Sequence, residues 1–65
     1  MTDAERETLD RMAADAEALA RTLDRESESP RLATGQALAD RWRARAADAR
    51  ADAAAIRAAL AKIAA

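Results

Sequence analysis

Few residues in this 65-residue chain carry side chains suited to catalysis. The sequence contains no histidine, cysteine or tyrosine, so it has no base poised near neutral pH and no thiol nucleophile. Its two serines, Ser27 and Ser29, have only carboxylates as candidate bases. We therefore expect no enzyme activity, no small-molecule substrate and no cofactor.

Two pairs of carboxylates have a spacing that places both on one helix face. Asp48 and Asp52 are four residues apart, as are Asp3 and Glu7. Such a pair could hold a divalent ion loosely, but hard cations take more ligands than two. We interpret both pairs as solvated acidic faces and predict no metal site.

Three arginines recur every seven residues, at Arg43, Arg50 and Arg57, with Trp42 and two further arginines nearby. One interpretation is a face that follows the phosphates of RNA or DNA. The other is a set of ion pairs to a first helix or to a partner chain. The net charge is −1 and the pI is about 5.3, which favours ion pairs because basicity is the footprint of a nucleic-acid binder.

Charge is divided between the two halves of the chain. Residues 1–26 carry four basic and eight acidic side chains, whereas residues 27–65 carry seven basic and four acidic ones. Opposite charges beside a helical seam attract and fix orientation. The halves are therefore suited to pairing with each other.

Apolar residues follow two heptad registers that predict such a pair of helices. Alanine fills 22 of the 65 positions, with one glycine and one proline, which is a helical composition. The inward positions predicted for the first register are Leu9, Met12, Ala16, Leu19 and Leu23. Those of the second are Ala39, Trp42, Ala46, Ala49, Ala53, Ile56, Leu60 and Ile63.

Local signals set the helix ends. Thr2 and Glu5 form a capping-box pattern, which predicts a first helix over about 3–26. Pro30 breaks the pattern, so a turn is expected over about 27–34 and a second helix over about 35–63. The second helix has two possible starts, at Pro30 or at Gly35. The whole of 1–65 is then one domain.

Packing the two registers antiparallel predicts an all-α helical hairpin with an Ala-rich heptad seam. If facing residue numbers add up to about 61–62, five layers form around a fold-back centred at Pro30–Arg31. The predicted layers are Leu23 with Ala39, Leu19 with Trp42, Ala16 with Ala46, Met12 with Ala49 and Leu9 with Ala53.

The same alignment leaves part of the second helix uncovered. Ile56, Leu60 and Ile63 find no apolar partners, and Leu38 widens the apolar surface beside Trp42. We predict a partner or dimer interface made of Leu38, Trp42, Ile56, Leu60 and Ile63. Contiguous exposed apolar surface marks an interface. We expect a homodimer that forms a four-helix bundle, or a groove on another protein, with Arg43, Arg50 and Arg57 setting orientation.

These features predict a role but not a partner. No apolar run reaches the roughly 18 residues of a membrane span, and no signal peptide is recognisable, so a cytoplasmic protein is expected. The Ala- and Arg-rich composition suggests a bacterial, plasmid or phage gene. We predict a stoichiometric regulator, adaptor or inhibitor acting through protein–protein contact, with RNA or DNA binding through the arginine stripe as the alternative.

Overall fold

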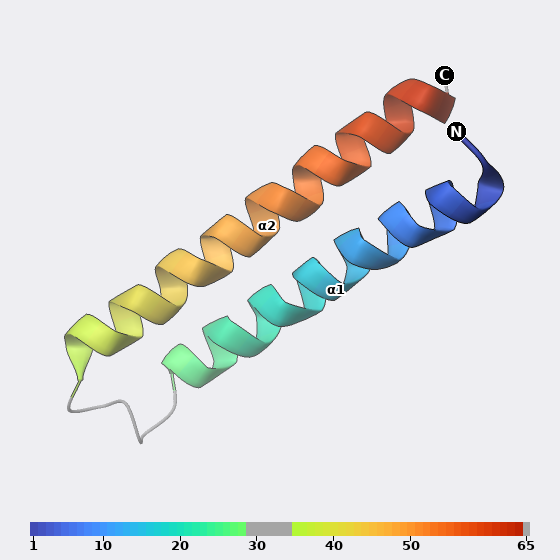
Figure 1. Cartoon of the computed structure of the whole chain (residues 1–65). Coiled ribbons are helices and arrows are strands. Elements are labelled where there is room, and N and C mark those ends of the chain that lie inside the picture. The colour runs from blue at the N-terminus through green and yellow to red at the C-terminus, as the bar shows by residue number, and fades with distance from the viewer. Residues whose placement is uncertain (29–34, 65) are drawn as a thin grey trace.

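The computed structural model describes residues 1–28 and 35–64, with only the backbone of Ala64. Two helices, α1 (Asp3–Ser27) and α2 (Gln36–Ala64), pack side by side in antiparallel orientation (Figure 1). The described part of the chain contains no strand, and the molecule is a rod about 48 Å long. The prediction of an all-α helical hairpin is confirmed.

A capping box starts α1, as the sequence predicted. The Glu5 amide donates to Thr2 Oγ1 at 3.1 Å, and the Glu5 carboxylate accepts from the Thr2 amide at 3.4 Å. Both contacts satisfy amide groups that have no partner within the first turn of a helix. The acidic Asp3 and Glu5 also lie at the positive end of the helix dipole.

The start of α2 agrees with the later of the two predicted positions. The Gly35 carbonyl accepts a hydrogen bond from the Ala39 amide at 2.9 Å, and the helix begins at Gln36. The alternative start at Pro30 and the predicted fold-back centre at Pro30–Arg31 lie outside the described residues. Ser27, which the sequence placed in the turn, forms part of the last turn of α1, where its Oγ donates to the Asp24 carbonyl at 2.6 Å.

The core between the helices is built mainly from alanine. Within the described residues, the buried apolar set is Ala13, Ala20, Leu23, Ala39, Ala46, Ala49 and Ala53. Alanine has no side chain beyond Cβ, so the two helices can approach closely along this line. The seam is therefore narrow and removes little apolar surface from water.

The predicted inward positions of α1 are wrong at Met12 and Leu19. These side chains are 51% and 53% exposed, while Ala13 and Ala20 are fully buried. Two heptad registers run through Leu9, Ala16 and Leu23. One also contains Met12 and Leu19, with spacings of 3-4, and the other contains Ala13 and Ala20, with spacings of 4-3. Periodicity alone therefore does not distinguish the two registers. The register with Ala13 and Ala20 is favoured because it allows close contact between the helices and brings acidic residues of α1 to the arginines of α2.

The predicted layers are also displaced along the helices. Ala20 and Leu23 cluster with Ala46 and Ala49, and Trp42 packs against this cluster. The predicted pairings of Leu23 with Ala39 and of Leu19 with Trp42 are therefore wrong. The residues of this cluster face each other if their numbers add up to about 65–66. Compared with the predicted sum of about 61–62, one helix is displaced along the other by about one helical turn.

Candidate interaction surface

The two flanks of the hairpin seam have different chemistry. On α1, three acidic residues each come one position after a seam residue, whereas Met12 and Leu19 each come one position before a buried alanine. Because successive helix residues are about 100° apart, these two sets lie on opposite flanks. We call the flank with Asp10, Glu17 and Asp24 the charged side, and the flank with Met12 and Leu19 the open side.

The same division holds on α2. The arginines of the heptad stripe each follow Trp42, Ala49 or Ile56 by one residue and lie on the charged side. Each of the buried Ala39, Ala46 and Ala53 is preceded by one residue that lies on the open side. Those preceding residues are Leu38, Arg45 and Asp52.

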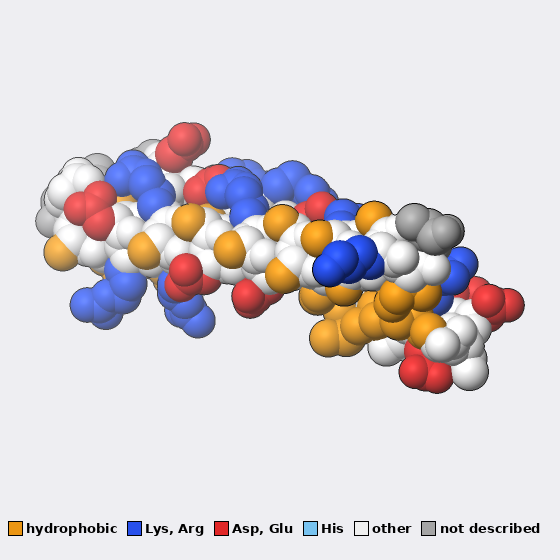
Figure 2. All heavy atoms as spheres, turned by 90° about the horizontal axis from the view of Figure 1, so that it is seen from above, with side chains coloured by type: hydrophobic (Ala, Val, Ile, Leu, Met, Phe, Trp, Pro, Cys, Tyr) orange, Lys and Arg blue, Asp and Glu red, His pale blue; other side chains and the backbone are white. Residues whose placement is uncertain are grey.

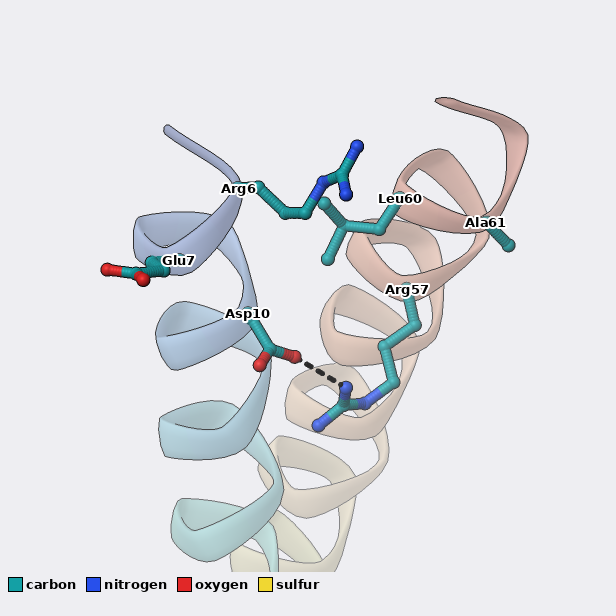
Figure 3. Close-up of a pocket in the computed structure, with 6 residues that line it drawn as sticks. All are labelled: Arg6, Glu7, Asp10, Arg57, Leu60 and Ala61. Carbon is teal, nitrogen blue, oxygen red and sulfur yellow. Dashed lines mark hydrogen bonds and ion pairs between the residues drawn. The ribbon is translucent and has the colours of Figure 1, made fainter. Parts of the chain in front are cut away.

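Ion pairs close the charged side. Arg57 donates from Nη2 and Nε to the two carboxylate oxygens of Glu17 at 2.7 and 2.9 Å. Figure 3 shows its other contact, in which Nη1 donates to Asp10 at 3.0 Å. Arg50 makes a further ion pair with Asp24. Two of the three stripe arginines thus make the ion pairs to the first helix that the sequence analysis favoured.

The contact with Glu17 shifts the titration of both partners. The hydrogen bond from Arg57 is the largest influence on Glu17 and lowers its pKa below the ordinary value; burial opposes this, and the charges of Arg57 and Arg21 add to the lowering. The hydrogen bonds to Glu17 and Asp10 raise the pKa of Arg57 further above its ordinary range. The pair therefore stays ionised throughout the neutral range.

Arg43 behaves differently from the other two arginines. It makes an ion pair with Asp40 of its own helix at 3.1 Å, and Gln36 donates to the same carboxylate oxygen at 2.8 Å. The two ion-paired arginines lie seven residues apart on α2, and their partners Asp24 and Glu17 lie seven residues apart on α1. Continuing this repeat places Arg43 opposite residue 31, which lies outside the described residues. Arg43 thus supports the start of α2.

The open side exposes large apolar side chains. Met12, Leu19 and Leu38 are 51%, 53% and 41% exposed. Next to them, Leu9, Trp42 and Ile56 are only half-buried. Figure 2, which looks onto α2, shows charged side chains along both edges and hydrophobic side chains gathered on one of these edges toward the end with the termini. One flank of the seam is therefore closed by ion pairs, and the other exposes the apolar side chains of Met12, Leu19 and Leu38.

Trp42 has one polar atom without a partner. The indole Nε1 is buried, and none of the described residues accepts its hydrogen bond. The Arg45 guanidinium lies 5.8 Å from the ring centroid, which is within reach of a cation–π contact. Trp42 thus packs against the core cluster and lies beside Arg45 of the open side.

A shallow groove lies between the helices near the termini. We call it the end groove; it has a volume of about 420 Å³ and is lined by Arg6, Glu7, Asp10, Arg57, Leu60 and Ala61. Figure 3 shows Arg6 extending toward Leu60, while Glu7 points away. Leu60 is half-buried, and Ile63 beyond it is 46% exposed. The residues of α1 that line the end groove, Arg6, Glu7 and Asp10, are all charged.

The predicted interface residues do not form one surface. Leu38, Trp42 and Ile56 lie on the open side, whereas Leu60 lines the end groove. Sequence reasoning assigned Met12 and Leu19 to the core, although they complete the open side. It also missed the acidic partners of the arginines, which a shared heptad spacing at Asp10, Glu17 and Asp24 would have indicated.

Comparison of the chain with protein-family models, with curated proteins and with solved structures finds no match. Within the described ranges, neither helix combines the length and apolar character needed to cross a membrane. The same residues contain no group of three side chains suited to holding a metal ion. The open side and the end groove are the surfaces on which a function can be argued.

Proposed function

We propose that this chain is a protein–protein interaction module that self-associates through the open side. The observation that carries the proposal is the joint exposure of Met12, Leu19 and Leu38 on one flank of a hairpin whose other flank is closed by ion pairs. Large apolar side chains gathered on one surface mark a binding site. In this role the protein acts stoichiometrically, as a regulator, an adaptor or an inhibitor, and catalyses no reaction.

The small core supports the same proposal. Six of the seven buried apolar residues in the described ranges are alanines, and each buries much less surface than a leucine. Domains of this size need oligomerisation, metals or disulfides when their own core is small. The sequence has no cysteine, so association is the remaining source of stability that these residues offer.

The ion pairs argue against the alternative function of binding RNA or DNA. A phosphate-tracking face needs arginines that are free to contact phosphates. Arg50 and Arg57 are instead engaged by carboxylates of α1, and Arg43 is engaged by Asp40. The basic stripe is therefore locally neutralised by acidic side chains.

Light scattering coupled to size-exclusion chromatography tests the proposal. The chain has a mass of 6.9 kDa, and we expect twice this mass at micromolar concentrations, falling toward the single-chain mass on dilution. A folded, helical chain that stays monomeric at all concentrations would contradict self-association. Retention on heparin that weakens steeply with salt would favour the nucleic-acid alternative instead.

A further inference from the structure

The open side carries its charges in a self-complementary order along α2. Arg41 and Asp48 follow Leu38 and Arg45 by three residues, so they share their helix face. Read toward the C-terminus, the edge runs from an apolar residue through two basic and two acidic residues to a second apolar residue. Its members are Leu38, Arg41, Arg45, Asp48, Asp52 and Ile56, all exposed except the half-buried Ile56.

This order brings like charges together within one helix, beside one attractive pair of Arg45 with Asp48 three residues on. Arg41 and Arg45 are like charges four residues apart, and so are Asp48 and Asp52, an arrangement that destabilises an isolated helix. In the part of the chain that the structure describes, no ion pair joins any of these four residues to α1. A surface with the reverse order of charges would stabilise this pattern.

A second copy of the same edge, run in the opposite direction, is that surface. We propose that a second copy of this chain docks on the open side with α2 antiparallel to α2. Arg41 then faces Asp52 of the second copy, Arg45 faces its Asp48, and Leu38 faces its Ile56. Each pair occurs twice, because a two-fold interface joins the same patch of both subunits. The inference rests on the proposed self-association and adds the orientation and the contacts.

The first helix fits the same arrangement. The midpoint between Arg45 and Asp48 lies level with Leu19, because facing residue numbers in the hairpin add up to about 65–66. The Leu19 side chains of the two copies therefore meet at the two-fold axis, where their exposed surface is buried. Asp15, the nearest acidic residue on this flank, faces Thr22 of the second copy and not another carboxylate.

A parallel dimer does not fit these charges. It would place α1 of one copy against α2 of the other at the same level, so Asp15 would lie opposite Asp48 and Asp52. Leu19 would then face the charged Arg45 and Asp48. Like charges in opposition disfavour an interface. Charge complementarity therefore selects the antiparallel arrangement.

Charge reversal within one chain tests the proposal. Arg45→Asp and Asp48→Arg are each expected to raise the dimer dissociation constant about tenfold, because each replaces two attractive pairs with two repulsive ones. The double variant R45D/D48R restores both pairs, and we expect its dissociation constant to return to within about threefold of the native value. Ala51→Asp, at an exposed position on the outer face of α2, is the matched control and should leave the constant unchanged.

Sedimentation equilibrium at low salt measures all four variants beside the native chain, with circular dichroism to follow helix content. A native chain that is monomeric overturns the proposed function and the docking together. A native dimer whose double variant is as weak as the single variants overturns only the antiparallel arrangement. Single variants that dimerise like the native chain place this edge of α2 outside the interface. If a single variant unfolds, recovery of helix content and dimer mass in the double variant supports the pairing, and its absence contradicts it.

Discussion

Arg57 and Glu17 lie 40 residues apart in the sequence and form a two-pronged ion pair across the hairpin, with contacts of 2.7 and 2.9 Å. The planar guanidinium matches the two oxygens of a carboxylate, which fixes the relative orientation of the two side chains. The third donor of Arg57 reaches Asp10 at 3.0 Å, so one side chain links two turns of α1. This contact fits the rotation of α1 that buries Ala13 and Ala20 and leaves Met12 and Leu19 on the open side.

Replacing Arg57 with lysine should weaken the hairpin, because a lysine ammonium does not match the carboxylate with two parallel hydrogen bonds. Both partners are partly exposed, with side-chain exposures of 43% and 38%, so the effect is modest. We expect the thermal midpoint to fall by about 3 °C at low salt. Arg11→Lys, at an exposed position of α1 away from the seam, should leave the midpoint unchanged. Equal effects of the two substitutions would show that the ion pair does not stabilise the fold.

The pH dependence follows from the lowered pKa of Glu17. A carboxyl whose pKa is lower in the folded state stabilises the fold fully above its ordinary value of 4.5, and this stabilisation is lost as pH falls through the folded value. Thermal melts at pH values from 7 down to 2.5 should therefore show a midpoint that decreases below about pH 4.5. Glu17→Gln should be less stable than the native chain at pH 7 and should converge with it at the acidic end. Parallel curves across the whole range would contradict this role of Glu17.

The hairpin could be predicted from the sequence, whereas the rotation of its first helix could not. The capping box at Thr2, the break at Pro30 and the two apolar periodicities are local signals, and they sufficed for two antiparallel helices. The choice between Met12 with Leu19 and Ala13 with Ala20 depends on how close the helices come and on which acidic residues reach the arginines. Both are tertiary properties, and hydrophobicity alone favours the larger side chains.

The buried alanines impose a size limit that can be measured. Ala46 is completely buried in the core cluster, so Ala46→Leu would force the helices apart, and we expect the free energy of unfolding to fall by about 1–3 kcal/mol. Ala47→Leu, at the adjacent exposed position, should change it by less than about 0.5 kcal/mol. Urea unfolding followed by circular dichroism compares the two variants. A larger loss for Ala47→Leu would show that the seam is assigned to the wrong face of α2.

Leu19 provides the sharpest test of the open side. Leu19→Glu places a charge where two leucines are proposed to meet, so we expect the dimer dissociation constant to rise at least about tenfold. Glutamate is a good helix former, and the hairpin should keep its helix content. Ala18→Glu introduces the same charge at the preceding exposed position, away from the seam, and should leave dimerisation intact. If Ala18→Glu disrupts the dimer and Leu19→Glu does not, the open side is not the interface.

Only part of the candidate surface could be predicted from the sequence, because the rotation of α1 depends on tertiary contacts. Leu38 was assigned to an interface because it flanks the second register beside Trp42, an inward position of that register, and the structure places both beside the open side. Met12 and Leu19 were assigned to the core, since an exposed leucine in a heptad is indistinguishable by type from a buried one. Only the position of the ion pairs shows on which flank the apolar residues lie.

A distance between two copies of the chain tests the central claim most directly. The sequence contains no cysteine, so Lys62→Cys provides a single site for a nitroxide label at an exposed position near the end of α2. In the antiparallel arrangement residue 62 of each copy lies far from the two-fold axis, which places the two labels about 45 Å apart at a rise of about 1.5 Å per residue. Pulsed electron paramagnetic resonance, at a protein concentration at which the labelled chain is dimeric, should show this distance. A distance under about 30 Å, the width of a parallel bundle with its labels, would contradict the antiparallel arrangement, and the absence of any dipolar signal would contradict self-association itself.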